Sequence, residues 1–491
     1  MAEFTIDLHC HPSIHSYGKS FSKNPGENSS DRSKKNSIWY YDPPTGSDRL
    51  LQRVLAVSEY SQSDFTTLNY GNVKCVCVSI YPVERGFVNM NIVDDGPVAD
   101  IFANFVAALG RERINFLQQN QDYFSDLENE YKYLQQLNDK ETNFSDGKRK
   151  YVLVKNFNQL EQLVEAGNNQ PDVEVLYVIM TVEGMHSLNA GTGNPPNEAE
   201  VLANLAKLKA WEHCPFFVTF AHHFYNELCG HAESLSGFVQ DLLTEQEPGM
   251  NTGFTALGWK VLKGLIDDTN GKRIHIDIKH MSTASRKEYI GFLKTNFPDA
   301  YKRKEFPLIM SHGACNGKIS AENPNPTPGL ETTASRMFDG DINFYDEEII
   351  EMARSGGIIG LQLDEKRIAS KQYKKSLRLL FASKSKRMHS NSKMLWNNIQ
   401  HIVQLLDQND IFAWDYIAIG SDFDGVIDPI NMFWSAEEMD DLVQYIERHA
   451  FNFFNDPATK LKNSFNKIEP INAVERIFHY NAYEFMRKYF K

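Results

Sequence analysis

The chain has 491 residues, of which 42% are hydrophobic, and it carries a formal net charge of −13 at pH 7. This length and apolar content support a large core, and they allow either several domains or one enlarged α/β barrel. The acidic balance excludes bulk nucleic-acid binding, which requires clustered Lys and Arg to neutralise phosphates.

The first predicted element is a strand in residues 4–12, which read FTIDLHCHP. Asp7, His9 and His11 occupy every second position, so they point to the same side of the strand. Two imidazoles at this spacing can hold one metal ion. The alternative is a pair of surface histidines, because an isolated His-x-His is common by chance, and the rest of the chain must decide.

Seven more strands follow, and helical periodicity separates nearly all of them. The eight strands are expected to begin near residues 4, 73, 173, 216, 273, 306, 357 and 416. Helices are predicted over residues 50–59, 97–133, 158–166, 198–211, 257–268, 285–296, 346–355, 394–408, 436–454 and 470–489. A charged, Asn-rich link is expected between the second and third of these helices.

This alternation predicts an α/β fold, a (β/α)8 TIM barrel with long βα-loop insertions and extra C-terminal helices. The main alternative is a doubly wound open sheet. Such a sheet would not need polar residues at the ends of so many strands, and no strand leads into GxGxxG or a Walker A loop. Residues 1–491 are therefore expected to form a single barrel domain with loop insertions.

Four long insertions follow strands, so the barrel would place them over its active face. They are expected at about 13–49, 224–255, 313–345 and 364–393. The last carries ten Lys or Arg. We interpret this charge as a solvated face, and the alternative is steering of anionic substrates.

Six strands end in a group that can bind a metal or transfer a proton. These groups are His9 and His11, Glu183, His222, His280, His312 and Asp422. Each one alone has a structural explanation, such as capping of the next helix by an aspartate. Their occurrence at equivalent strand ends, which converge on one face of a barrel, favours a metal centre.

The residue types indicate two metal ions of the zinc kind. Imidazole and carboxylate suit Zn²⁺, and four histidines with a carboxylate exceed what one catalytic ion takes. Two ions about 3.5–4 Å apart can hold a hydroxide between them and orient its attack on a carbonyl. Glu183 is the expected bridge, and Asp422 would move the proton from the water to the leaving nitrogen.

Six short motifs carry a resemblance to a known family. DLHCHP, VEGMHS, TFAHH, IDIKHMS, MSHGA and IGSDFDGV occur in the order seen in the membrane dipeptidase (renal dipeptidase, peptidase M19) family of the amidohydrolase superfamily. The resemblance spans nearly the whole chain, and IGSDFDGV and VEGMHS are its most specific parts.

The resemblance implies a barrel that hydrolyses dipeptides with two Zn²⁺ ions per chain. It implies that His9 and His11 bind one zinc, that His280 and His312 bind the other, and that Glu183 bridges them. Asp422 resembles the catalytic acid/base and is also counted among the predicted metal ligands. His222 resembles the residue that stabilises the polarised carbonyl oxygen and so contacts the substrate.

The chain departs from the family at two places. The family usually has His-x-Asp at the first strand, whereas His11 here makes the first metal site less negative. The family's carboxylate-binding arginine lies after the sixth strand, where this chain is expanded and Arg336 is the nearest candidate. No secretory signal or lipid-anchor tail is expected, so the membrane part of the family name does not carry over.

Several nearby residues receive a structural interpretation. Lys279 alternates away from His280, so a carbamylated bridging lysine is not expected there. His186, His223 and His231 are interpreted as solvated loop histidines, and the alternative is that they support the metal ligands from behind. Six scattered cysteines, at 10, 75, 77, 214, 229 and 315, are predicted to be thiols in a reducing compartment.

The predicted function is that of a cytoplasmic dinuclear metallo-dipeptidase in which a metal-bound hydroxide attacks the amide carbonyl. The expected partner is a small dipeptide or related amide, without nucleic acid or membrane. Such barrels commonly dimerise, so a homodimer is considered, although the sequence shows no interface. The alternatives are another hydrolase of the superfamily, acting on a cyclic amide, lactone or phosphoester, and a binding protein with an inactive relict site.

Overall fold

The computed structural model describes residues 4–49, 60–88, 109–120, 122–168, 172–235, 246–377, 382–459 and 461–491. The predicted helix 50–59, and residues 97–108 of the predicted helix 97–133, lie outside these ranges.

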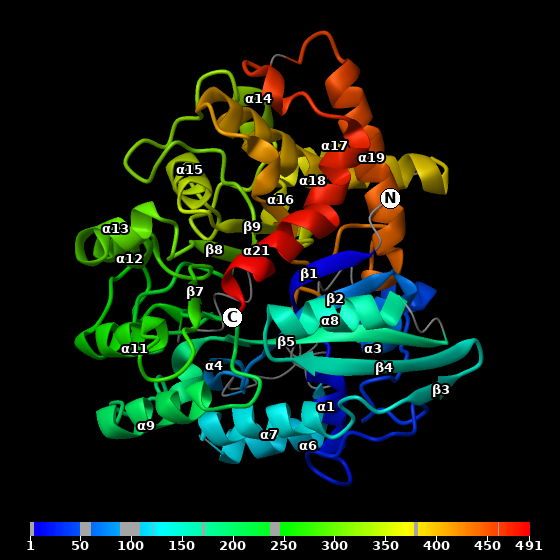
Figure 1. The fold of residues 1–491 in the computed structure, drawn as a ribbon, viewed down its shortest axis with the longest axis vertical. Helices are drawn as coiled ribbons and strands as arrows, with labels where there is room; N and C mark the ends of the chain where they lie inside the picture. Colours follow the sequence, from blue (N-terminus) through cyan, green and yellow to red (C-terminus); the bar gives the residue numbers. More distant parts are fainter. Residues whose placement is uncertain are drawn as a thin grey trace, which may run out of the picture.

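Within the described residues, eight parallel strands close a barrel (Figure 1), which confirms the predicted TIM-barrel fold. The strands are β1 (Thr5–Cys10), β2 (Val73–Ile80), β5 (Val173–Glu183), β6 (Phe217–Thr219), β7 (His275–Asp277), β8 (Ile309–Gly313), β9 (Ile358–Leu361) and β10 (Ile417–Ile419). Each pairs with the next along the chain, and β10 returns to pair with β1. All eight predicted strands are therefore confirmed, with their order.

A hairpin that the sequence did not predict extends the barrel sheet. It consists of β3 (Thr142–Phe144) and β4 (Gly147–Val154), which lie in the expected Asn-rich link. β4 pairs in parallel with the first part of β5, on the edge opposite β2. The β4 sequence GKRKYVLV begins with exposed charged residues and becomes fully buried only at its end, so its strand pattern is weak.

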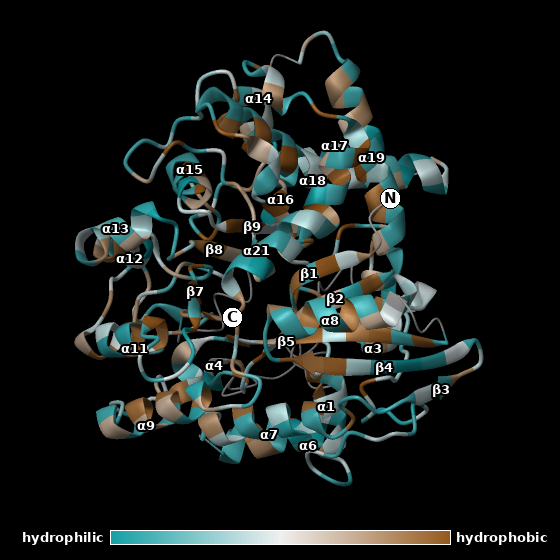
Figure 2. Cartoon of the chain, viewed as in Figure 1, coloured by the Kyte–Doolittle hydropathy of each residue, from teal (hydrophilic) through white to brown (hydrophobic). Residues whose placement is uncertain are grey.

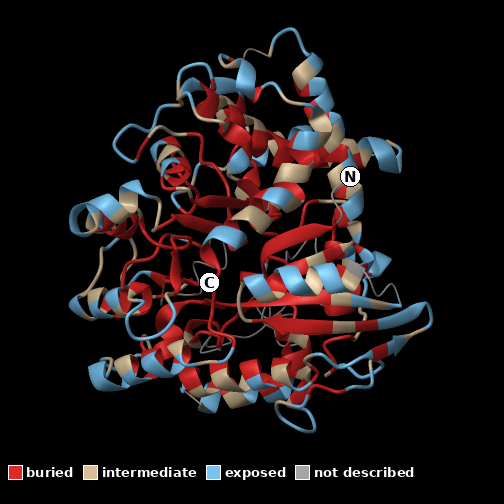
Figure 3. Ribbon diagram, in the orientation of Figure 1, coloured by how far each residue is buried: buried red, intermediate tan, exposed pale blue. Residues whose placement is uncertain are grey.

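Long helices surround the strands, and their apolar sides face the sheet (Figures 1 and 2). They are α8 (Phe157–Asn168), α9 (Glu198–Lys209), α11 (Ala256–Ile266), α12 (Thr283–Asn296), α15 (Asp346–Arg354), α18 (Lys384–Gln408), α19 (Met439–Asn455) and α21 (Asn481–Tyr489), and the short α20 (Pro470–Glu475) precedes α21. Figure 3 shows the barrel strands buried and the outer helix faces exposed. α21 contacts β1, β9 and β10, so the C-terminal helices complete the core.

Shorter elements occupy the loops. They are α1 (Ile14–Ser20), α3 (Phe65–Tyr70), α4 (Arg85–Val88), α13 (Pro298–Lys302), α14 (Glu331–Ala334), α16 (Glu365–Ile368) and α17 (Lys371–Ser376), together with the 3₁₀ turns Met185–Leu188, Ala413–Asp415, Ala436–Glu438 and Ser464–Asn466 and the π turn Arg476–Tyr480.

Two helix predictions were wrong in extent. The described part of the long helix 97–133 is two helices, α6 (Arg111–Gln119) and α7 (Tyr123–Gln135). Asn120 is extended, with φ −113° and ψ 120°, and the Asp122 side chain then caps α7 by accepting from the Ser125 N–H. α18 begins at Lys384 and not at residue 394, because the Ser383 side chain caps it there. The basic insertion 364–393 therefore holds α16, α17 and the first turns of α18.

All six cysteines are buried and unpaired, as predicted. Among the described residues, no helix combines the length and the apolar content that a membrane-spanning segment needs.

Candidate metal centre

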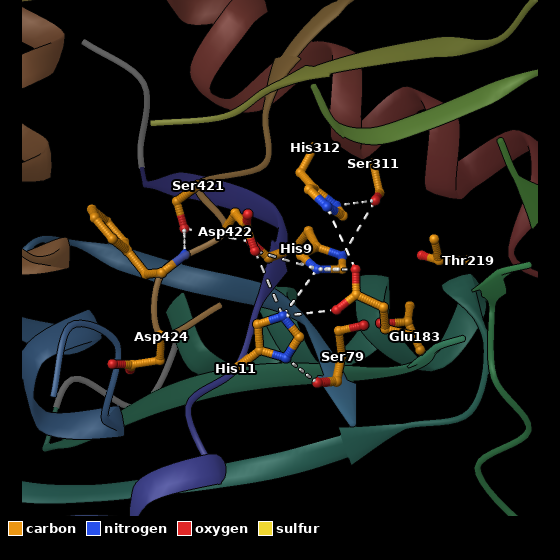
Figure 4. A network of polar contacts seen from close by, with 12 residues as sticks. His9, His11, Ser79, Glu183, Thr219, Ser311, His312, Ser421, Asp422 and Asp424 are labelled. Atoms are coloured by element: carbon orange, nitrogen blue, oxygen red, sulfur yellow. Dashed lines mark hydrogen bonds and ion pairs between the residues drawn. The ribbon is translucent and has the colours of Figure 1, made fainter. Parts of the chain in front are cut away.

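Seven of the eight predicted site residues come together at the carboxyl ends of the barrel strands. Figure 4 shows His9, His11, Glu183, His312 and Asp422 among them. They come from six strands: His9 on β1 and His11 just after it, Glu183 at the end of β5, His222 after β6, His280 after β7, His312 on β8 and Asp422 after β10. All seven are buried, and the most exposed, Asp422, shows 8% of its surface.

The Glu183 carboxylate lies at the centre of this cluster. Its Oε2 is 3.2 Å from His11 Nε2 and 3.4 Å from His222 Nε2. Its Oε1 is 3.5 Å from the Nε2 atoms of the three other histidines, His9, His280 and His312. This Oε1 is buried and accepts no hydrogen bond from any described residue, so the cluster lacks a partner that a cation would supply.

The histidines form two pairs whose spacing fits metal coordination. His9 Nε2 and His11 Nε2 are 3.2 Å apart, and His280 Nε2 and His312 Nε2 are also 3.2 Å apart. Two nitrogens bound at about 2.0–2.1 Å to one tetrahedral ion are separated by about 3.3 Å. Each pair with Glu183 gives three ligand atoms that lie within 4.8 Å of one another. The arrangement is consistent with a binuclear metal site.

Asp422 adds a third overlapping group with His9 and His312. Its Oδ1 is 3.9 Å from His9 Nε2 and 3.7 Å from His11 Nε2. Asp422 and His280 both have a φ of 63°, a left-handed conformation that costs energy for residues other than glycine. Gly425 permits the close approach of Asp422, because a Cβ at that glycine would lie 2.0 Å from Asp422 Oδ1.

Hydrogen bonds behind the cluster orient the imidazoles. His11 Nδ1 lies 2.7 Å from the Ser79 carbonyl oxygen, so the Nδ1–H donates there and Nε2 faces Glu183. The Ser311 hydroxyl lies 3.2 Å from His9 Nδ1 and 2.8 Å from His312 Nδ1 (Figure 4). This hydroxyl donates to Asp277 Oδ2, so its oxygen accepts from both imidazoles and leaves both Nε2 atoms free for a metal.

Sequence reasoning missed the acid that orients His222. Glu84 Oε2 is 2.6 Å from His222 Nδ1, and Glu84 Oε1 accepts from the Phe224 N–H at 3.0 Å. Glu84 is 3% exposed and follows β2, one of the two strands for which the sequence suggested no polar group. Its place just after a barrel strand is the signal that could have identified it.

The electrostatics favour positive charge at the centre of the cluster. Burial raises the pKa of Glu183, but the surrounding imidazoles outweigh it and hold the pKa well below its ordinary value. Burial lowers the pKa of His280 and of His312 well below the ordinary value, which leaves both imidazoles neutral, as metal binding requires. Burial also lowers the pKa of His222, but the carboxylates of Glu84 and Glu183 outweigh it and raise the pKa.

A cavity opens beside the cluster, with an empty volume of about 520 Å³ including its opening to solvent. Its lining includes Glu183, His222, His223, Lys279, His280, Gln362, Asp364, Arg367 and Asp422.

The prediction that Lys279 points away from the site was therefore wrong, because the chain turns left-handed at His280 and strand alternation no longer applies. Burial and the nearby Arg367 lower the pKa of Lys279 to about 8.

Arg336 lies apart from this cavity. Its Nη1 donates to Asn397 Oδ1 at 3.0 Å, and its guanidinium lies over the Tyr373 ring. The prediction of solvated histidines is wrong for His186 and His231, which are 2% and 0% exposed, whereas His223 is half-buried and lines the cavity.

No family model matches the chain, and no curated protein is detectably similar in sequence. The dipeptidase AC, a metallopeptidase of family M19, aligns with 100% of this chain and 99% of its own at 11% identity, with a TM-score of 0.52. The chain has the fold of an M19 dipeptidase.

Two more solved structures align with long parts of the chain. A metallopeptidase from Rhodobacter sphaeroides, liganded with a phosphinate mimic of the dipeptide L-Ala-D-Ala, matches 100% of both chains at 11% identity, with a TM-score of 0.49. The probable dipeptidase PvdM from Pseudomonas aeruginosa matches 87% of this chain and 88% of its own at 14% identity, with a TM-score of 0.47.

Proposed function

We propose that this protein is a zinc-dependent hydrolase that cleaves the amide bond of dipeptides or similar small amides. The observation that supports this most directly is the position of the Glu183 carboxylate between two pairs of histidine nitrogens. The M19 resemblance of the sequence motifs and the M19-like fold point to the same reaction.

In this proposal His9 and His11 hold one Zn²⁺, His280 and His312 hold a second, and Glu183 is shared. Asp422 stands close enough to His9 and His11 to be an additional ligand. A donor set of imidazole and carboxylate without thiolate suits zinc. When bound, two such ions supply Lewis acidity that polarises an amide carbonyl and activates water.

The chain's own residues would then move protons and hold the substrate. Asp422 lines the cavity, so its carboxylate can take a proton from water and return it to the leaving nitrogen. His222 would donate from Nε2 to the carbonyl oxygen as negative charge develops there. Glu84 holds the opposite nitrogen of His222, which keeps the ring in position for this donation.

The test is a panel of dipeptides, with L and D residues at the C-terminal position, assayed beside lactones and phosphodiesters. We expect dipeptide turnover by zinc-loaded protein, and a loss of about 10²–10³-fold in kcat for Asp422→Asn or His222→Gln. His389→Gln, on α18, is the matched control. No dipeptide turnover with full metal loading would reject the peptidase proposal.

Metal analysis separates an active enzyme from a relict. Protein purified without added zinc should contain zinc, or regain about two ions per chain on dialysis against Zn²⁺. Occupancy near zero that dialysis does not restore would favour a binding protein with an inactive site.

We also propose that residues 1–491 form one catalytic domain in the cytoplasm. The six buried, unpaired cysteines support this compartment, because thiols persist where the surroundings are reducing.

A further inference from the structure

Two cations line the cavity beside the metal cluster, and the proposed hydrolysis uses neither. Lys279 follows β7, and Arg367 lies on α16 after β9, so two different barrel strands bring them to one cavity. The sequence suggested neither as a substrate-binding residue, and Arg336, the cation that it did suggest, lies elsewhere.

Lys279 is 2% exposed. Its backbone N–H donates to Asp277 Oδ1, but its ammonium group makes no hydrogen bond or ion pair with any other residue in the described ranges. An ammonium on a buried side chain is stabilised by an acceptor, and no described residue supplies one to Lys279. Its position in the cavity lining gives it access to a ligand there.

Arg367 is only partly satisfied. Its Nη2 donates to the Ser234 carbonyl oxygen, and its Nε is 4.0 Å from Asp364 Oδ2. The other oxygen of Asp364 accepts from the Lys366 N–H, where this carboxylate caps α16. Among the described residues no other group accepts a hydrogen bond from the guanidinium, which therefore keeps donors for a ligand.

Charge balance in the cavity decides the kind of ligand. Glu183 and Asp422 are the acids within the cluster, and in the proposed function their charges would be balanced by the zinc ions. Lys279 and Arg367 would then be two neighbouring cations, with Asp364 and Glu233 as the remaining acids near Arg367. Two carboxylates on the substrate would neutralise the pair, and guanidinium and ammonium groups bind carboxylates with charge-assisted hydrogen bonds.

We propose that Lys279 and Arg367 form an oxyanion-binding subsite that selects substrates with two carboxylates, such as dipeptides with Asp or Glu at the C-terminal position. This inference rests on the proposed function.

The first test compares kcat/KM for Ala-Glu and Ala-Gln, which differ in one charge and have nearly the same shape. We expect wild-type protein to prefer Ala-Glu by tenfold or more. Arg367→Gln and Lys279→Gln should each bring this ratio toward one, and Arg367→Lys should retain part of it. Arg336→Gln is the matched control and should keep the wild-type ratio.

A wild-type ratio near one would overturn the inference, and so would a ratio that falls in Arg336→Gln and not in Arg367→Gln. Circular dichroism and zinc content, measured on every variant, identify those that have not folded. If Arg367→Gln has not folded, Arg367→Lys replaces it in the comparison, because it keeps the positive charge and changes the side chain least.

A binding measurement separates failure of the subsite from failure of the peptidase proposal. Ala-Glu and glutarate are titrated calorimetrically into wild type and Arg367→Gln, and inorganic phosphate is titrated as a second oxyanion. Binding of the dicarboxylates that weakens tenfold in the variant supports the subsite, even without turnover of any dipeptide. Equal affinity in both proteins, or a preference for phosphate over both dicarboxylates, overturns it.

Discussion

The Ser311 hydroxyl contacts one histidine of each metal-binding pair, so Ser311→Ala should weaken both halves of the site together. The substitution removes the acceptor of His9 Nδ1 at 3.2 Å and of His312 Nδ1 at 2.8 Å. Asp277 Oδ2 loses one donor but keeps the Thr219 hydroxyl at 2.8 Å. Two buried N–H groups are then left without their acceptor.

Each unsatisfied buried donor costs about 1–3 kcal/mol. The two together therefore cost about 2–6 kcal/mol in the metal-binding state, in which both histidines carry their proton on Nδ1. Loss of a group that orients a metal-binding histidine typically lowers metal affinity about 10–100-fold. Because the two affected histidines belong to different pairs, we expect both zinc affinities to fall by about this factor.

The assay is a zinc titration against a chelator of known affinity, followed by metal analysis after gel filtration. Ser79→Ala is the matched control, since the Ser79 hydroxyl is buried without a hydrogen-bond partner in the described residues and only its carbonyl holds His11. Two zinc ions bound with wild-type affinity by Ser311→Ala would refute the reasoning. Loss of only one ion would refute the shared role of the hydroxyl.

Three further predictions concern the support of the site and the stability of the barrel. Glu84→Gln should lower kcat tenfold or more with little change in KM, because a neutral amide holds His222 less strongly than a carboxylate does; steady-state kinetics that show a raised KM and unchanged kcat would contradict this. Gly425→Ala should displace Asp422 and reduce kcat while urea unfolding stays near wild type, and wild-type kcat would show that the carboxylate needs no such space. Burial lowers the pKa of His275 to about 4, below its ordinary value of 6.5, so the native state holds this imidazole neutral while the unfolded chain takes up a proton as the pH falls through 6.5. The unfolding free energy should therefore drop by about 2 kcal/mol from pH 7 to pH 5 through this group, and urea titrations of His275→Gln should lack that part of the loss.

Local patterns in the sequence determined the barrel and the residues at its active face. Each barrel strand is a short apolar segment between helical periodicities, and parallel strands must place their carboxyl ends on one side. A polar residue at such an end is visible without knowledge of its neighbours. His9, Glu183, His280 and the others could therefore be grouped from their positions alone.

Only the tertiary structure decided which side chains support that group. Glu84 is 138 residues from His222, and Ser311 is 302 residues from His9, and neither contact leaves a periodic signal. The direction of the Lys279 side chain depended on the left-handed conformation of His280, which strand alternation does not describe. The position of Arg336 depended on the path of a long insertion. A strand repeats every two residues and a helix every 3.6, but a hydrogen bond between distant loops depends on how all the elements pack together.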